Sequence, residues 1–329
     1  MAEATIRDVA RRAEVSVASV SRTLNAPATV HPATRERVLA AIAELRYVPH
    51  AGARSLSMRS SHAIGVVLPD LHGEFFSELV RGMDREASAR GYQLLLSMMH
   101  DDAGLAGQAL RAMRGRVDGM VVMAPQLDPV AIEAVVPGLP TVLVNCLGES
   151  VRPSLMVDNA GGIEAVVEHF VAVGRRRIVH LAGPTANRDA RERADAYRVT
   201  LARLLPGTEP IVIEGDFLER SGAVAIAQLV VDGVACDAVC AANDMMALGA
   251  IGALREREIH VPDQVAVAGF DDIPLSRYLG VTTVAVRMDA LGARAIARLA
   301  NMLGGEEDSG EIELIRPALV VRGSSERQE

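Results

Sequence analysis

The stretch TIRDVARRAEVSVASVSRTLN, residues 5–25, decides how the chain begins. Apolar residues in its first half repeat at the spacing of one helix face, and Thr5 stands in the N-cap position before them. A turn at residues 14–16 separates this helix, 6–13, from a second helix predicted at 17–25. Two short helices joined by so tight a turn are typical of a helix-turn-helix unit.

A third helix is predicted at residues 32–45, where Pro32 occupies the first turn. In a helix-turn-helix unit the second helix enters the major groove of DNA with its N-terminal end. Val17 and Ala18 would then meet base edges, where they sense shape and thymine methyl groups, and Arg22 would supply a bidentate contact to guanine. Short polar side chains suited to phosphate contacts are Thr5, Ser16, Ser21 and Asn25. The alternative is a helical cap that packs on the rest of the chain.

Charge and composition narrow the function classes. Residues 1–60 contain nine Arg and five acidic residues, whereas the rest of the chain contains 25 Arg and 37 acidic residues. A basic end on an acidic body favours contact with phosphate through the end alone. The chain has no Lys, which excludes a P-loop and a pyridoxal-type Schiff base. With three Cys, no apolar signal-peptide core and no membrane span, we expect a cytoplasmic protein with reduced thiols.

From residue 63 onward, short apolar runs alternate with amphipathic, Ala-rich stretches, which is the pattern of βαβ units around parallel strands. Strands are predicted at 63–68, 93–98, 119–123, 141–145, 178–182, 211–214, 238–241 and 265–268. Helices between them include 76–90, 162–173, 189–204, 221–230 and 244–255. So many strands predict two doubly wound halves with a break near Asp158 or Asn159, and a ligand cleft at the carboxyl ends of the strands.

Together with TRERVLAAIAELRYVPHAGARSL, residues 34–56, the opening stretch closely resembles the headpiece and hinge of the lactose/galactose-repressor (LacI/GalR) family of bacterial transcription regulators. Later matches are VDN at 157–159, LAGP at 181–184, AND at 242–244, GFDD at 269–272 and TTV at 282–284. The resemblance implies a helix-turn-helix headpiece at 1–48 and a hinge at 49–60. It also implies a two-lobed effector-binding and dimerisation domain at 61–329, similar to periplasmic sugar-binding proteins.

The resemblance further implies a homodimer on a pseudo-palindromic operator, with residues 50–58 folding into a hinge helix on the DNA. Leu56 would enter the minor groove at the operator centre and kink the duplex, and Ala53 would be its small packing partner. Residues 51–57 are too few to form a stable helix alone, so folding on DNA is physically reasonable. The alternative is a flexible linker. Because no heptad repeat extends beyond Gly323, we expect a dimer.

Transferred position by position, the resemblance implies effector contacts from both halves of the body. These residues are Phe75, Phe76, Asn145, Arg193, Phe217, Asn243 and Asp271. Amide, carboxylate and guanidinium groups suit a polyol, and Phe rings can stack on a pyranose, so the expected effector is a small sugar. Core packing of the Phe rings and a solvated Arg193 are the structural alternatives. Asp70, His72 and Glu74 are further candidates for the same cleft.

The predicted function is therefore a repressor that a small sugar releases from its operator. Two alternatives keep the DNA-binding role with a purine-type co-repressor or a phosphocarrier-protein partner, and a third is a plain cytoplasmic solute-binding protein. An enzyme is not expected, because no Gly-x-Ser-x-Gly elbow or Gly-rich phosphate loop is present. Cys236 and Cys240 lie four residues apart without a second pair of ligands, so no metal and no cofactor are expected.

Overall fold

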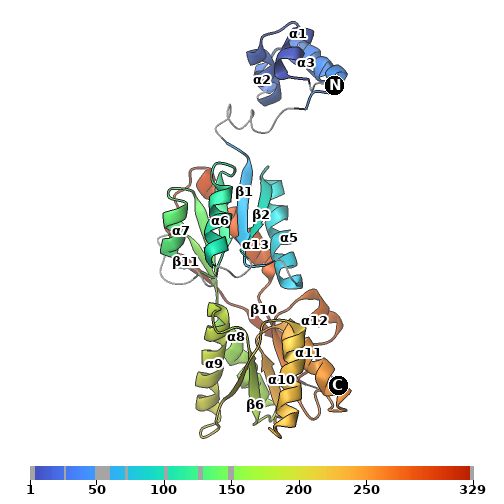
Figure 1. The fold of residues 1–329 in the computed structure, drawn as a ribbon, viewed down its shortest axis with the longest axis vertical. Coiled ribbons are helices and arrows are strands. Elements are labelled where there is room, and N and C mark those ends of the chain that lie inside the picture. Colours follow the sequence, from blue (N-terminus) through green and yellow to red (C-terminus); the bar gives the residue numbers. More distant parts are fainter. Residues whose placement is uncertain are drawn as a thin grey trace. The chain divides into compact units, whose positions relative to one another are not determined.

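The computed structural model describes residues 4–25, 27–48, 60–70, 73–99, 103–124, 129–146 and 152–326 (Figure 1). The chain divides into two compact units. Unit 1 contains Met1–Ala63 and Arg116–Asp118, and unit 2 contains Ile64–Gly115 and Gly119–Glu329. The helices described in unit 1 all lie within residues 4–48, which we call the headpiece.

The headpiece is a small helical bundle. Its helices are α1 (Ile6–Arg12), α2 (Val17–Asn25) and α3 (Pro32–Leu45), with one 3-10 turn, η1 (Pro27–Thr29), before α3. Each of the three helices places one fully buried valine in a common core: Val9, Val20 and Val38. The three predicted helices are confirmed, and α2 and α3 have the predicted bounds. This core fixes which face of α2 remains outside.

Unit 2 consists of two lobes, each built on a six-stranded sheet flanked by helices (Figure 1). The N-lobe sheet has the order β11-β5-β4-β3-β1-β2 and the C-lobe sheet has the order β12-β10-β9-β8-β6-β7. Where the described residues define a register, the strand pairings are parallel, apart from the antiparallel β10–β12 pair. The predicted α/β body with two doubly wound parallel-sheet lobes is confirmed.

The N-lobe strands are β1 (Ala63–Leu68), β2 (Gln93–Met98), β3 (Gly119–Met123), β4 (Thr141–Val144), β5 (Ser154–Val157) and β11 (Ile312–Ile315), with helices α5 (Glu74–Ala89), α6 (Ala103–Met113), α7 (Pro129–Val135) and α13 (Met288–Leu303). The C-lobe strands are β6 (Ile178–Ala182), β7 (Ile211–Glu214), β8 (Ala238–Ala241), β9 (Ala266–Asp271), β10 (Thr282–Ala285) and β12 (Ala318–Val320), with helices α8 (Asn159–Ala172), α9 (Arg188–Leu204), α10 (Glu219–Val231), α11 (Asp244–Glu256) and α12 (Pro274–Tyr278). The central strands β1, β3, β6, β8 and β9 are buried along their whole length, as expected for parallel strands covered on both faces.

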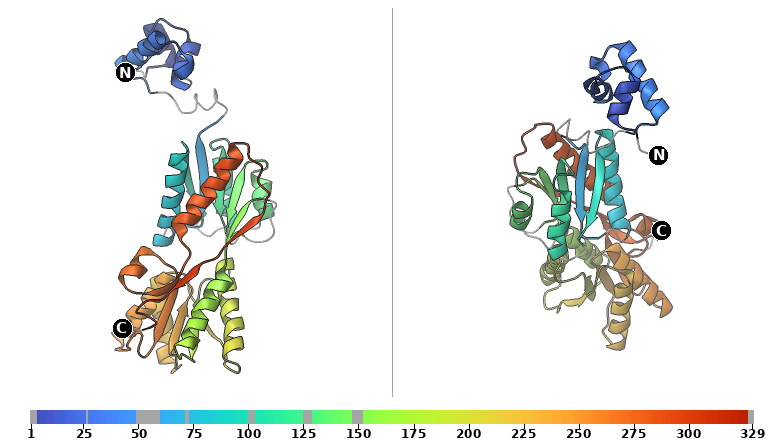
Figure 2. Two further views of the ribbon diagram at one scale, coloured as in Figure 1. Left: turned by 180° about the vertical axis from the view of Figure 1, so that it is seen from behind. Right: turned by 45° about the horizontal axis from the view of Figure 1, so that its top comes forward.

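The chain crosses between the lobes three times (Figure 2). It leaves the N-lobe after β5 at Asp158, returns after β10 to form α13 and β11, and crosses again to add β12 to the C-lobe sheet. The prediction of a single break near Asp158 or Asn159 therefore identified only the first crossing. The lobes are not two consecutive halves of the sequence, because the last part of the chain completes both sheets.

Within the described residues, none of the helices combines the length and the apolar character that crossing a bilayer requires. Cys146 and Cys240 are buried free thiols, and Cys236 is a half-buried free thiol. Burial raises the pKa of Cys146 and of Cys240 to about 12, so these two are packing residues and not reactive thiolates.

Candidate functional site

The first candidate site is the outer face of α2. At about 100° per residue, the residues predicted to meet DNA fall within an arc of roughly 140° around this helix: Val17, Ala18, Ser21, Arg22 and Asn25. Val17 is 42% exposed, and Ala18 and Arg22 are exposed. Val20 and Thr23 are buried on the opposite side. The headpiece core therefore turns the predicted base-reading residues outward together.

Two of the predicted phosphate contacts also shape the headpiece. Thr5 forms a capping box with Asp8, in which Asp8 N–H donates to the Thr5 hydroxyl at 3.4 Å and Thr5 N–H donates to the Asp8 carboxylate at 3.0 Å. The Ser16 hydroxyl accepts from Ser19 N–H at 3.1 Å, just before α2 begins. Both hydroxyls therefore cap helix ends, and any phosphate contact would be additional to that role.

At the other end of α2, the Asn25 amide nitrogen donates to the Ser21 hydroxyl at 3.3 Å. The Asn25 amide oxygen is buried and has no partner among the described residues. The predicted minor-groove residues Ala53 and Leu56 lie outside the described residues. The headpiece thus presents the predicted recognition face of α2.

The second candidate site is a cavity of ≈ 160 Å³ between the two lobes of unit 2, which we call the interlobe cavity. Six of the seven predicted effector contacts line it: Phe75, Phe76, Arg193, Phe217, Asn243 and Asp271. They follow β1, β7, β8 and β9 or lie on α5 and α9, so the cavity forms at the carboxyl ends of parallel strands, as predicted.

Asp271, at the end of β9, is a buried carboxyl group of this cavity that lacks one hydrogen-bond partner. It is only 6% exposed, and its Oδ1 atom has no hydrogen-bond partner among the described residues. Burial raises the pKa of Asp271 well above its usual value, Arg193 opposes this shift, and Asp244 and Asp189 add to it. A buried polar atom without a partner costs free energy, so a ligand hydroxyl that donates to Asp271 would remove that cost.

Arg193 supplies the positive charge of the cavity and is held from several sides. Its Nε atom donates to the Asn159 side chain at 2.8 Å, and one terminal nitrogen donates to the Ala242 carbonyl oxygen at 2.6 Å. The guanidinium carbon lies 3.7 Å from the centre of the Phe270 ring. The alternative of a solvated Arg193 is wrong, because the side chain is 5% exposed.

Phe217 and Asn243 form one corner of the cavity. The Asn243 amide nitrogen donates to the Phe217 carbonyl oxygen at 2.9 Å, and its amide oxygen caps α11 by accepting from Met246 N–H at 2.9 Å. Phe217 has a left-handed backbone, with φ 68°. Its ring lies against Gly183, where an added Cβ would meet the ring at 2.3 Å. Glycine at 183 thus leaves the space for this aromatic wall.

The N-lobe side of the cavity is aromatic and acidic. Phe75 and Phe76, at the start of α5, make an edge-to-face contact with ring centroids 4.9 Å apart. Both rings also pack against the buried core of the body, so the core role and the cavity role coexist. Asp70 and Glu74 line the cavity, whereas His72 lies outside the described residues.

Asn145 is the one predicted contact that does not line the cavity. It is 2% exposed, donates to Asp189 Oδ2 at 3.1 Å and accepts from Val157 N–H at 2.9 Å. Asp189 lines the cavity and also accepts from Asn159 at 2.9 Å. Asn145 of the N-lobe therefore does not face the cavity itself, but hydrogen bonds to Asp189 of the C-lobe, which does.

Sequence reasoning missed several cavity residues: Asn187, Asp189, Asp216 and Met245. Asp189, Asp216 and Asn187 follow predicted strands or begin a predicted helix. The position just after a strand end was the available signal.

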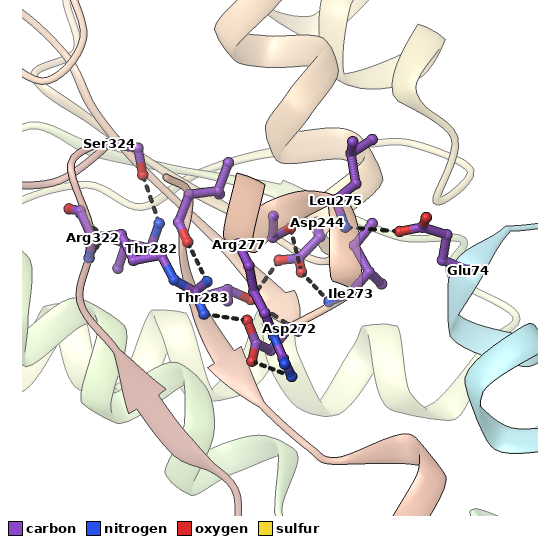
Figure 3. A network of polar contacts seen from close by, with 12 residues as sticks. Glu74, Asp244, Asp272, Ile273, Leu275, Arg277, Thr282, Thr283, Arg322 and Ser324 are labelled. Carbon is purple, nitrogen blue, oxygen red and sulfur yellow. Dashed lines mark hydrogen bonds and ion pairs between the residues drawn. The ribbon is translucent and has the colours of Figure 1, made fainter. Parts of the chain in front are cut away.

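A buried polar network fixes the loop that carries Asp271 (Figure 3). Asp244 accepts from the Thr283 hydroxyl, from Ile273 N–H at 2.9 Å and from the Ser276 hydroxyl at 2.8 Å. Burial raises the pKa of Asp244 to about 6, although these hydrogen bonds act in the opposite direction. Within the network, Asp244 ties α11, β10 and the residues after β9 together, and so sets the position of Asp271.

A second hydrogen bond, besides the one from Asn145 to Asp189, crosses between the lobes at the edge of the same cavity. Leu275 N–H, in α12 of the C-lobe, donates to Glu74 Oε2 of the N-lobe at 3.0 Å (Figure 3). On a separate route, Arg188 of the C-lobe donates to the Cys146 carbonyl oxygen at 2.6 Å. Both bonds hold the two lobes together.

The chemistry of the cavity suits an uncharged, hydroxyl-rich ligand. Carboxylates and an arginine provide acceptors and donors, and three Phe rings provide apolar walls. Within the described ranges, no group of three or more His, Cys, Asp or Glu is arranged to hold a metal ion.

Comparisons with known proteins agree with this geometry. Residues 5–50 match the family model described as bacterial regulatory proteins, lacI family, and residues 167–325 match the model of a periplasmic binding protein-like domain. The chain is 34% identical to the ribose operon repressor of Escherichia coli K12, over 98% of this chain and 100% of that protein. It is 31% identical to the transcriptional repressor PurR of Photobacterium profundum, over 98% of each chain.

Solved structures support the same assignment. A crystal structure of the Lac repressor dimer bound to operator and the anti-inducer ONPF matches with a TM-score of 0.90 at 31% identity, over 98% of this chain and 99% of that one. A complex of the transcriptional regulator CelR with cellobiose matches with a TM-score of 0.72 at 30% identity, over 98% of this chain and 100% of that one.

Proposed function

This chain belongs to the lacI family of bacterial regulatory proteins, and from that premise we propose that it is a dimeric DNA-binding repressor that a small sugar releases from a pseudo-palindromic operator. It acts in the cytoplasm, where its DNA is, and binding and release, not catalysis, are its activity. The relatives named above are regulators as well.

The observation that carries the effector assignment is the buried Asp271 oxygen without a partner in a cavity of ≈ 160 Å³. Sites for drug-sized ligands occupy roughly 300–1,000 Å³, so the smaller volume favours a single sugar ring. A sugar hydroxyl donates to Asp271, another accepts from Arg193, and a ring face packs on Phe217. The name of the ribose operon repressor makes ribose the first sugar to test.

The DNA-binding assignment depends on α2. Val17, Ala18 and Arg22 set the base preference, and Thr5, Ser16, Ser21 and Asn25 contact the backbone. Leu56 of the hinge enters the minor groove at the operator centre, and Ala53 packs beside it. Sugar binding moves the N-lobes of the dimer relative to each other, so the two hinges no longer pair on DNA. By linkage, DNA weakens sugar binding by the same factor.

The test has two stages. Thermal unfolding is first measured with ribose, galactose, glucose, cellobiose and hypoxanthine, and a ligand that raises Tm is then added to the protein on a DNA duplex selected from a randomised pool. We expect one monosaccharide to raise Tm and to lower DNA affinity by at least tenfold. A purine that raises both Tm and DNA affinity would establish the co-repressor alternative.

The hinge assignment is tested separately with Leu56→Ala. We expect this variant to lose operator affinity by about tenfold or more, because it lacks the wedge that opens the base step, while sugar affinity stays unchanged. Unchanged operator affinity would remove Leu56 from the proposed role.

A further inference from the structure

Asp118 gathers four hydrogen bonds within unit 1. Its carboxylate accepts from the Ser60 hydroxyl at 2.6 Å, from Ser61 N–H at 2.6 Å, from the Ser61 hydroxyl at 2.8 Å and from His62 N–H at 2.8 Å. In addition, Asp118 N–H donates to the Ala63 carbonyl oxygen at 2.8 Å. One half-buried side chain therefore holds three consecutive residues just before β1, through the backbone of Ser61 and His62 and the hydroxyls of Ser60 and Ser61.

These bonds keep Asp118 ionised. Burial alone would raise the pKa of Asp118, but the hydrogen bonds from Ser60, Ser61 and His62 outweigh it and lower that pKa. Hydrogen bonds to a charged acceptor are stronger than neutral ones. His62 is held in a left-handed conformation, with φ 50°, which the free chain would rarely adopt. The segment is thus held in one defined path.

The C-lobe contains a counterpart at the same place in its sheet. Asp237 precedes β8 as Asp118 precedes β3, and it accepts from Arg176 N–H at 3.1 Å and from Arg177 N–H at 2.8 Å, just before β6. Asp237 N–H also donates to the Arg177 carbonyl oxygen at 3.0 Å. In both cases an aspartate at the start of one strand pins the residues that lead into the neighbouring strand.

The two sites differ in what the pinned residues are attached to. Residues 176–177 follow α8 inside the C-lobe, so Asp237 secures a connection within one lobe. Ser60 is the last residue of the hinge, which the family resemblance places at residues 49–60. We propose that Asp118 is a positioning residue for operator binding. It anchors the body end of the hinge and so transmits the effector signal to it.

The physical reason is preorganisation. DNA binding must fix the direction in which the hinge leaves the body, and ordering backbone residues costs conformational entropy. Asp118 fixes residues 60–62 before DNA arrives, so binding does not carry that cost. The anchor also connects the hinge end to β1 and β3, which pair with each other through Ile64 and Gly119. We infer that a movement of these strands is passed on to residues 60–62 through Asp118.

The experiment compares Asp118→Asn with the matched variant Asp237→Asn in the full-length dimer. DNA is a duplex that the wild-type protein selects from a randomised pool, and the ligand is whichever monosaccharide raises the wild-type Tm. We expect Asp118→Asn to weaken operator affinity about tenfold or more and to reduce the sugar-dependent change in that affinity at least threefold. Sugar affinity stays at the wild-type value in both variants, and Asp237→Asn retains normal operator binding.

The change in net charge cannot explain a loss of operator affinity in Asp118→Asn. Asp118→Asn removes a negative charge, and that change alone favours binding to a polyanion. A second variant, Ser60→Ala with Ser61→Ala, keeps the carboxylate and its two backbone bonds but removes both hydroxyl donors. This double variant should also weaken operator binding, by a smaller factor than Asp118→Asn. If Asp118→Asn does not fold, the operator affinity of the double variant tests the proposed role of Asp118 instead.

The inference rests on the proposed function, and the outcomes separate the two. Wild-type protein that selects no DNA would overturn both. Wild-type protein that binds DNA, together with loss of affinity in Leu56→Ala but none in Asp118→Asn, would keep the hinge and remove Asp118 from it. Equal losses of Tm and of operator affinity in Asp118→Asn and Asp237→Asn would reduce Asp118 to a structural bond like its counterpart.

Discussion

The two lobes have equivalent strand orders, yet they contribute different chemistry to the interlobe cavity. The C-lobe contributes buried polar groups whose positions are fixed by hydrogen bonds, above all Arg193 and the loop of Asp271 held by Asp244. The N-lobe contributes two Phe rings at a helix start and the half-buried carboxylate of Glu74. We infer that the C-lobe determines which ligand binds and that the N-lobe covers it.

This difference indicates that ligand selectivity depends mainly on the C-lobe and that closure of the lobes depends mainly on the N-lobe. A polar site is selective when its groups are held before the ligand arrives, and the C-lobe meets that condition. A cover needs only apolar contact and a weak polar bond, because its position must change when the ligand leaves. Substitutions in the C-lobe should therefore affect affinity strongly, whereas those in the N-lobe cover should affect closure mildly.

The largest effect is expected from Arg193→Met. The variant loses the bonds to Asn159 and Ala242 and leaves the Asp271 carboxylate without its positive neighbour. We expect sugar affinity to fall at least 100-fold and the free energy of unfolding to drop by about 3–5 kcal/mol, as when one partner of a buried pair is removed. Calorimetric titration and chemical denaturation measure both. Arg198→Met, on the exposed side of the same helix, is the control, and equal behaviour of the two variants would contradict the comparison.

A smaller effect is expected from Gly183→Ala. The added Cβ would lie 2.3 Å from the Phe217 ring, so the ring must leave its place and the aromatic wall is lost. We expect sugar affinity to fall about 30-fold, or roughly 2 kcal/mol, while operator affinity without sugar is retained. Gly252→Ala is the control, because no atom lies within 4 Å of a Cβ added there. Normal sugar binding by Gly183→Ala would mean that Phe217 does not form a wall of the site.

The pH dependence of stability should also distinguish the lobes. Asp244 has a pKa raised to about 6 in the folded protein. Its contribution to the free energy of unfolding is therefore fully present below its unfolded pKa of about 3.8 and is lost as the pH rises through about 6. Between pH 4 and 7, the stability of wild type minus that of Asp244→Asn should fall by about 2 kcal/mol, as measured by chemical denaturation.

The variant is needed as a reference because His180 has the opposite effect. Burial lowers the pKa of His180 to about 4, so its contribution is present above pH 6.5 and is lost as the pH falls through about 4. In unit 1, hydrogen bonds lower the pKa of Asp118. The corresponding stability difference for Asp118→Asn should therefore rise as the pH rises from the acidic end. A difference for Asp244→Asn that does not change with pH would mean that folding does not raise the pKa of Asp244.

The smallest effect is expected from Glu74→Ala. This variant loses the single bond from Leu275 N–H that joins the lobes at the cavity edge. The bond is exposed to solvent, so its loss should shift the equilibrium between open and closed lobes by only about 0.5–1 kcal/mol. This shift would lower sugar affinity about threefold. Glu78→Ala, on the same helix and paired with Arg81, is the control. A loss of affinity as large as that of Arg193→Met would show that the N-lobe is more than a cover.

Much of the architecture was predictable from local pattern. Strands β1, β2, β3, β6, β7 and β8 have the predicted bounds, because each contains a run of apolar residues that stands out from the amphipathic stretches around it. Strands β5, β10, β11 and β12 were not predicted as strands. In β11 and β12, partly buried residues stand beside exposed ones, so these two strands lack the continuous apolar run of a buried strand.

The candidate site was predictable to the extent that it follows strand ends. Arg193, Asp271 and Phe217 were placed by resemblance and lie where strand ends converge. The network around Asp244 could not be read from the sequence, because its partners Ser276 and Thr283 are 32 and 39 residues away. Asn145 was assigned to the ligand and instead contacts Asp189, since sequence cannot distinguish a residue in the cavity wall from one directly behind it.

The three crossings between the lobes have a consequence for synthesis of the protein. The N-lobe sheet lacks β11 and the C-lobe sheet lacks β12 until the last part of the chain has been made. At about 5–20 residues per second, Ile315 of β11 follows Ala63 of β1 by roughly 13–50 seconds. The headpiece, residues 4–48, leaves the ribosome long before either lobe is complete. During synthesis, the DNA-binding headpiece is therefore complete before the lobes that regulate it.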